Sequence, residues 1–223
     1  MELNFSYLLR NTHIIADGVW LTVILSTFAI SLGYVFGVLL AIMRRSPYKA
    51  LRLVAGVYIE IVRNTPLLVQ VFLLFFGLSI LGLKLPAMIV AIIAMVLNTI
   101  AYTAEIMRAG FDAIKPGQWE AADALGLNKA QTYWHVALLP ATEKVYPSLS
   151  SQFVLMMLAT SITSQISVDE LTAIANFLQA QSYRPFETYI VTALIYVLLS
   201  LVLRAALWAI GRVIFPRLRV QKA

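Results

Sequence analysis

Five long, almost charge-free runs constrain this chain more than any other feature. They cover residues 18–43, 64–83, 85–104, 145–168 and 188–211, and Arg204 is the single charge within them. Crossing the hydrocarbon of a bilayer takes about 20 mostly apolar residues in a helix, which satisfies its own backbone hydrogen bonds there. The runs predict an all-α integral membrane protein with five transmembrane helices.

Composition supports the same class. Hydrophobic residues make up 61% of the 223 residues and charged residues 13%, against about 45–50% and 25% in soluble chains. The first run is longer than a signal-peptide core and lacks a cleavage site, so we expect it to be retained. Cysteine is absent, which excludes disulfides and thiol catalysis. Without an internal repeat or a linker, residues 1–223 are predicted to form a single transmembrane domain.

The basic residues predict the orientation of the helices. When the loop at residues 44–52 is placed inside, all of the 17 Lys and Arg residues except Arg10, Lys84 and Arg184 fall on that side. Short loops rich in Lys and Arg remain in the cytoplasm. We therefore expect the amino terminus outside and the carboxyl terminus in the cytoplasm. The net charge of +6 reflects this topology and does not indicate a nucleic-acid partner.

Two features predict how the first helices pack. Ala29, Gly33, Gly37 and Ala41 are spaced four apart, a small-residue stripe that lets another helix approach closely. Residues 49–62 are amphipathic, and the following Asn64-Thr65-Pro66 offers a cap and a first-turn proline. The second helix is therefore expected to kink or restart near Pro66.

The longest cytoplasmic segment, residues 111–144, is predicted to form an elbow of two short helices. Pro116-Gly117 is read as a turn, and residues 118–125 are good helix formers with acids in the first turns. Gly126 is expected to end this helix in a left-handed backbone conformation.

The second helix of this elbow is expected to begin at Asn128. Gln131, three residues later, completes a capping box. The two helices would present Ala121, Ala122 and Leu125 on a narrow face, where small side chains let a partner protein come close.

These residues resemble the cytoplasmic signature of permeases of ATP-binding-cassette (ABC) importers, in which Glu-Ala-Ala is followed by Gly. Glu120-Ala121-Ala122 and Gly126 match it in place. Three further segments resemble the polar amino acid uptake branch, which includes histidine, glutamate, glutamine and arginine permeases, and they occur in the family's order: residues 62–70, 101–110 and 184–187.

The resemblance implies the fold of ABC type I importer permeases in a bacterial cytoplasmic (inner) membrane. It also implies three partners: a dimer of ATPase subunits, a second permease chain and a periplasmic or surface solute-binding protein. ATP and Mg²⁺ would be bound by the ATPase, and this chain would hold no cofactor. The elbow residues carried over as the ATPase contact are Gly117, Glu120, Ala121, Ala122, Gly126 and Asn128.

The chain departs from the family pattern in two places. Leu139 stands where relatives usually have the proline that closes the elbow, and Pro140 follows one residue later. Relatives often carry Lys-Asp before a Thr-Ser in the fourth helix, where this chain has Leu158-Ala159. The missing acid favours a heterodimer of permease chains over two copies of this one. The sequence leaves the solute open.

Polar residues in the spans suggest a route for the solute. Asn98, Thr160, Ser161 and Gln165 are candidates to line it, although each is also typical of a hydrogen bond between helices. Two charge pairs, Glu60 with Arg63 and Glu105 with Arg108, are interpreted as structural contacts at the inner edge of the membrane.

Other functions find less support. The chain lacks a phosphate-binding Gly-x4-Gly-Lys-Ser/Thr loop, so it is not expected to be an enzyme, and any ATP hydrolysis would come from a partner. The alternative is a secondary transporter or channel subunit driven by an ion gradient, which would more naturally show inverted repeats and mid-span acids. His13 and His135 lie on opposite sides in this topology, so no metal site is expected.

Overall fold

The computed structural model describes residues 3–215, which form helices and connecting turns without a strand in that range. The basic residues Arg217, Arg219 and Lys222, counted above on the inner side, lie outside the described residues. The elements are α1 Ser6–Arg10, α2 Thr12–Arg44, α3 Lys49–Arg63, α4 Leu67–Ile80, α5 Ala87–Asp112, α6 Pro116–Ala124, α7 Lys129–Gln131, the π-helix η1 Thr132–Ala137, α8 Leu138–Ala159, the 3₁₀ helix η2 Thr160–Ile166, α9 Leu171–Ser182 and α10 Pro185–Ile214.

The helices account for the predicted membrane spans. Within residues 3–215, four helical stretches are long and apolar enough to cross a bilayer: α2, α5, α10 and the continuous run of residues 129–166. Helices α3 and α4 pass the same test only as a pair, bent by 106° at their junction, and give a fifth span when counted together. The all-α membrane fold is confirmed within the described residues, with four spans or five.

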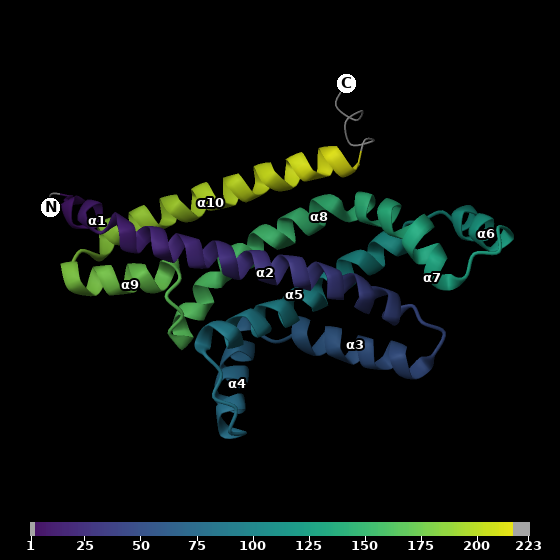
Figure 1. Ribbon diagram of the computed structural model, residues 1–223, viewed down its shortest axis with the longest axis horizontal. Coiled ribbons are helices and arrows are strands. Elements are labelled where there is room, and N and C mark those ends of the chain that lie inside the picture. Colours follow the sequence, from purple (N-terminus) through teal and green to yellow (C-terminus); the bar gives the residue numbers. More distant parts are fainter. Residues whose placement is uncertain (1–2, 216–223) are drawn as a thin grey trace.

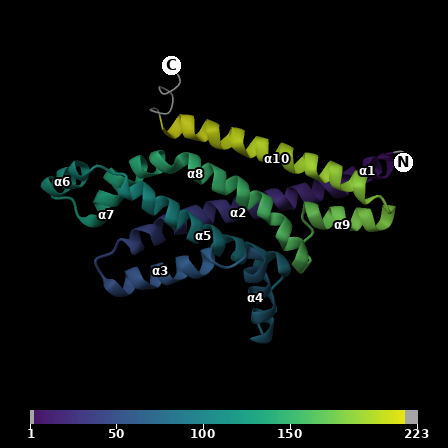
Figure 2. The same cartoon turned by 180° about the vertical axis from the view of Figure 1, so that it is seen from behind.

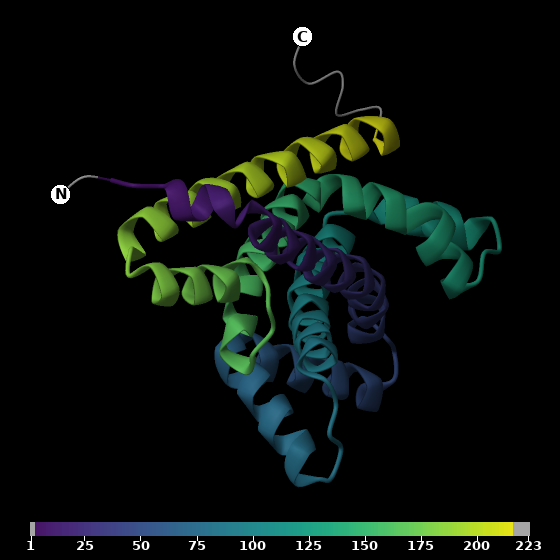
Figure 3. The same ribbon diagram turned by 60° about the vertical axis from the view of Figure 1, so that its left-hand side comes forward.

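The long helices run along the long axis of the molecule, and different short helices lie at its two ends. Figures 1 and 2 show α2, α5, α8 and α10 along the long axis, with α6 and α7 at one end and α1 and α9 at the other. Helix α4 diverges from this bundle, as Figure 3 shows. The end that carries α6 and α7 is called the elbow end below.

The small-residue stripe of α2 lies against another helix, as predicted, and that helix is α5. Ala29 and Ala41 are fully buried. A Cβ atom added at Gly33 would lie 2.4 Å from the Thr99 side chain, and one added at Gly37 would lie 2.6 Å from that of Thr103. Two helices can therefore approach this closely only because these positions lack side chains.

The break between α3 and α4 occurs where the sequence predicts it but is capped differently. Pro66 occupies the N-cap position of α4 in an extended conformation, one residue earlier than the first-turn position expected. Asn64 ends α3 and donates from Nδ2 to the Glu60 carbonyl at 2.8 Å. Asn64 therefore closes the helix before it, and the predicted cap on the following helix is wrong.

Other helix ends also differ from the sequence-based ranges. Helix α5 continues to Asp112, beyond the apolar run that ends at residue 104. Helix α8 gives way to the tighter η2 at Thr160. The last span, α10, contains the whole run expected for it and extends it at both ends.

Candidate functional site

The elbow begins with α6, whose end has the geometry predicted for it. Gly126 takes a left-handed conformation with φ of +71°. The Leu127 N–H donates to the Ala122 carbonyl at 3.1 Å, and the Gly126 N–H donates to the Asp123 carbonyl at 3.0 Å. This pair of bonds is the Schellman motif, which satisfies the last carbonyls of a helix and requires positive φ at the residue after its cap.

The start of α6 differs from the prediction. Pro116 stands in the first turn of α6, where its fixed φ suits a helix and its missing N–H costs nothing. Gly117 is therefore helical and does not form the turn expected from the Pro-Gly pair. Its α-carbon faces open space, with no atom within 4 Å of an added Cβ.

Asn128 forms the predicted capping box, but the helix that it starts is long. Its Oδ1 accepts from the Gln131 N–H at 3.0 Å, and its own N–H donates to Gln131 Oε1 at 2.9 Å. Helix α7 then continues through η1 into α8. Pro140 follows the π-helical turn closely, and because it lacks an N–H it leaves the Val136 carbonyl without its usual partner. The second helix of the elbow is thus the beginning of a span and not a short separate helix.

The face that α6 presents to solvent is not the one expected. Ala122 is only 1% exposed and packs inward, whereas Leu125 is 77% exposed. Glu120 and Ala121 are also exposed. The outward face therefore combines Ala121 and Leu125 with an acidic neighbour, and Ala122 helps to hold the elbow on the molecule.

Aromatic rings attach the elbow to the membrane helices. Trp119 of α6 meets Tyr133 of η1 edge to face at 5.4 Å between ring centroids, and Tyr133 meets Phe111 of α5 at 5.3 Å. The Arg45 guanidinium, just after α2, lies 5.7 Å from the centroid of Trp119. Such edge-to-face and cation–π contacts favour one arrangement of the rings.

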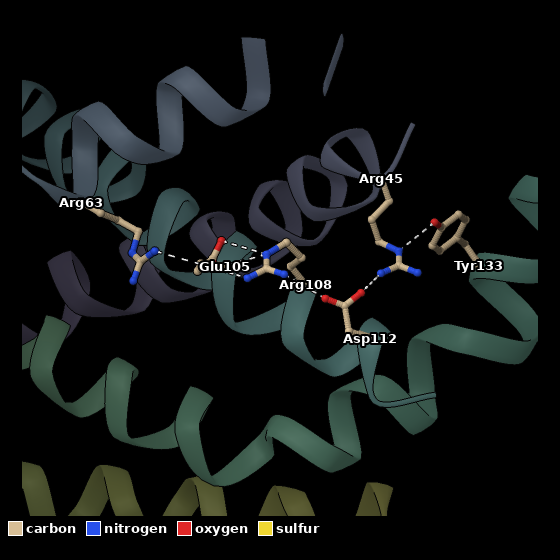
Figure 4. Close-up of polar contacts among 6 residues, drawn as sticks. All are labelled: Arg45, Arg63, Glu105, Arg108, Asp112 and Tyr133. Carbon is tan, nitrogen blue, oxygen red and sulfur yellow. Dashed lines mark hydrogen bonds and ion pairs between the residues drawn. The ribbon is translucent and has the colours of Figure 1, made fainter. Parts of the chain in front are cut away.

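A chain of charges continues from this attachment along α5 (Figure 4). Arg45 pairs with Asp112, and its Nε donates to the Tyr133 hydroxyl at 3.4 Å. Arg108 donates to Asp112 at 2.9 Å and from Nε to both Glu105 oxygens at 3.2 Å. Arg63 at the end of α3 lies 3.9 Å from Glu105. The chain joins α2, α3, α5 and η1, and it runs from the elbow end to the end of α3.

The two sequence-predicted charge pairs have different outcomes. Glu105 and Arg108 pair as expected, while Arg63 approaches Glu105 and not Glu60. Glu60 instead accepts from Asn64 Nδ2 at 3.2 Å. Glu60 and Arg63 belong to the same helix, but Arg63 lies closer to Glu105 of α5, whose carboxylate is held in place by Arg108.

Asn98 belongs to a polar cluster at the break between α3 and α4. Its Nδ2 donates to Gln70 Oε1 at 3.0 Å. Gln70 Nε2 in turn donates to the Val62 carbonyl at 2.8 Å and to the Thr65 carbonyl at 3.0 Å. The Gln70 amide, which Asn98 holds in place, thus satisfies backbone carbonyls at the break.

The hydroxyl-rich turn η2 is locally bonded. Thr160 is fully buried, and its hydroxyl donates to the Met157 carbonyl at 2.7 Å. The Ser161 hydroxyl donates to the Leu158 carbonyl at 2.9 Å. Gln165 is exposed. The structure therefore separates the four path candidates: Asn98 and Thr160 are buried and partnered, while Ser161 and Gln165 reach the surface of the chain.

Comparison with known proteins identifies the class of this chain. Residues 33–220 match the family described as the binding-protein-dependent transport system inner membrane component. The chain belongs to this family. Such permease components provide the membrane part of a transport system, and the resemblance inferred from the elbow signature is confirmed.

Curated relatives are permeases of similar length. The chain is 33% identical over 199 residues to the probable glutamine ABC transporter permease protein GlnM of Bacillus subtilis, covering 89% of this chain and 92% of GlnM. It is 33% identical over 228 residues to the octopine transport system permease protein OccM of Rhizobium radiobacter, covering 98% of this chain and 93% of OccM.

Solved structures give the same fold. An amino acid ABC transporter crystallised with histidines has a chain that is 36% identical, with a TM-score of 0.85 over 95% of this permease and 99% of that chain. The inward-facing MetNI methionine ABC transporter has a TM-score of 0.77 at 18% identity, over 90% of this permease and 96% of that chain. The predicted importer permease fold is confirmed.

Several contacts of this permease were not predicted. The sequence assigns Arg45 only to the inner side of the membrane, whereas its side chain contacts both Asp112 and Tyr133. Asp112 lies four residues after Arg108, a spacing that itself indicates a helical ion pair. Gln70 was visible as an amide within an apolar run, which is typical of a polar contact between helices. The pairing of Arg45 with Asp112 depends on tertiary structure, so no local sequence pattern indicates it.

Proposed function

We propose that this permease carries a polar amino acid or related small solute through the membrane and is driven by a separate ATPase that docks on the elbow. The observation that carries the proposal is the solvent-exposed helix α6, which is closed by the Schellman motif at Gly126 and followed by the capping box at Asn128. Relatives named as glutamine and octopine permeases support the solute class.

The geometry suggests how movement of the ATPase would reach the membrane helices. Leu125 and Ala121 offer an apolar contact, and Glu120 offers a charge to a basic group on the ATPase. A displacement of α6 would act on α5 through Trp119, Tyr133 and Phe111. The same displacement would act on α2 through Arg45.

The charge chain extends this connection to the broken span. Arg108 and Glu105 link Asp112 to Arg63, which lies at the end of α3 directly before the break. Interrupted helices at membrane depth are typical places for solute contacts, because they expose backbone groups to a cavity. The Gln70–Asn98 cluster lies at this break, and we assign it and η2 to the solute route.

The complete transporter would contain further chains. We expect a dimer of ATPase subunits that binds ATP and Mg²⁺, a second permease chain and a solute-binding protein outside the bacterial cytoplasmic membrane. The family description, a component of a binding-protein-dependent system, supports a separate binding protein.

Docking can be tested on the exposed face of α6. Leu125→Asp should leave the permease in the membrane but reduce ATPase co-purification, because a charge replaces the apolar centre of the face. Leu9→Asp is a matched control at the opposite end, since Leu9 is 71% exposed and Leu125 is 77% exposed. Equal ATPase recovery with both variants would argue against the elbow as the docking site.

A further inference from the structure

We propose that a groove at the elbow end binds the anionic phosphate headgroup of a membrane phospholipid. The groove has a volume of about 710 Å³ and lies among the end of α2, the start of α3 and α5. Its lining residues are Arg44, Lys49, Arg52, Leu53, Glu60, Glu105 and Arg108. This site is separate from the docking face of α6 and from the Gln70–Asn98 cluster.

The charges of the groove do not cancel one another. Glu105 and Arg108 neutralise each other through their paired hydrogen bonds. None of the ion pairs between described residues involves Arg44, Lys49 or Arg52. Glu60, the remaining carboxylate, is eight residues from Arg52, about 12 Å along α3. Arg44 acts on Glu105 at longer range, but one end of the groove still has three cations that form no ion pair with a carboxylate among the described residues.

The cationic end is held in shape by the backbone. Arg44 lies over Gly56, where an added Cβ would be only 1.7 Å from Arg44 Nη1. The same Nη1 donates to the Arg52 carbonyl at 3.3 Å, and Arg52 Nη1 donates to the Ser46 carbonyl at 3.3 Å. A guanidinium has five N–H donors in a fork that suits phosphate oxygens. Both side chains are thus positioned with most of their donors available.

The position of the groove favours a lipid as the source of the phosphate. Helix α2 has 33 residues, or about 50 Å at 1.5 Å per residue, compared with a hydrocarbon thickness of about 30 Å. Its end at Arg44 can therefore reach the headgroup layer on the elbow side. Beside the cations, α3 exposes apolar side chains that suit acyl chains: Leu51, Leu53, Val54, Val57 and Ile61.

The test compares lipids on the purified transporter complex. Native mass spectrometry with added phosphatidylglycerol or phosphatidylcholine should show preferential retention of phosphatidylglycerol. Arg52→Gln and Lys49→Gln should each weaken that retention about five-fold, as expected for one basic residue near an anionic surface. Lys84→Gln, which removes a charge from the turn between α4 and α5, should not weaken it.

Salt provides a second measurement on the same samples. Because exposed charges are screened by salt, added NaCl should reduce phosphatidylglycerol retention more in the unmodified complex than in Arg52→Gln. Equal retention of the two lipids, or equal effects of Arg52→Gln and Lys84→Gln, would overturn the proposal. Displacement of phosphatidylglycerol by millimolar inorganic phosphate or free amino acid would also overturn it, since the groove would then be a site for soluble anions.

Discussion

Replacement of Gly126 by valine should uncouple the elbow without unfolding the membrane helices. The φ of +71° at this position costs an L-residue about 1–2 kcal/mol, and a β-branched residue belongs at the upper end of that range. No heavy atom lies within 4 Å of an added Cβ. The whole penalty is therefore a backbone penalty on the Schellman motif and not a clash with a neighbour.

The size of the effect follows from this penalty. A cost of about 1–2 kcal/mol lowers the equilibrium constant for forming the native elbow by about 5-fold to 30-fold. When docking requires that conformation, ATPase affinity should fall by up to the same factor. Asn tolerates the left-handed region better than other residues, so the expected order of affinity is Gly, then Asn, then Ala, then Val.

The assay is ATPase titration onto the permease in nanodiscs, together with ATP-dependent uptake after reconstitution. Gly126→Asn is the matched control, because it adds a side chain at the same place with a smaller backbone penalty. Native ATPase affinity and uptake in Gly126→Val would refute the reasoning, and so would equal losses in Gly126→Asn and Gly126→Val.

Four further predictions concern helix packing, the charge chain, the solute route and the topology. Gly33→Leu should separate α2 from α5 and lower thermal stability by several degrees, whereas Gly77→Leu should not, because an added Cβ at Gly77 meets no atom within 4 Å; equal melting temperatures for both would contradict the packing account. Arg45→Gln should weaken uptake more than Arg45→Lys, which keeps the charge that pairs with Asp112; equal losses in the two variants would mean that the pair does not link α2 to α5. Apolar replacement of Thr160, Ser161 and Gln165 should reduce transport while assembly is retained, and unchanged uptake would limit η2 to packing. In the cysteine-free chain, a cysteine at position 176 should react with an external reagent and one at 128 should not, and the reverse pattern would invert the predicted topology.

The local features of the site could be predicted because their causes are local. The Gly126 stop and the capping box of Asn128 and Gln131 depend on backbone preferences within a few residues. The small-residue stripe of α2 likewise follows from helical spacing, and the close approach of another helix was confirmed. Long apolar runs predicted the spans for the same reason.

Features that depend on tertiary structure could not be predicted from the sequence. Proline marks the break between α3 and α4, but the 106° angle is set by what each helix packs against. Ala122 turns inward because α6 rests on η1, so its small size does not place it on the docking face. Arg63 pairs with Glu105 and not with Glu60 of its own helix, because α5 packs alongside α3.

The central claim is tested most directly by uptake of a labelled polar amino acid into proteoliposomes that contain this permease, its co-purified ATPase and any second permease chain, with the binding protein supplied outside. The account predicts accumulation that requires ATP on the elbow side and is lost in Leu125→Asp. Accumulation by the permease alone, driven by an ion gradient without ATP or the ATPase, would contradict it.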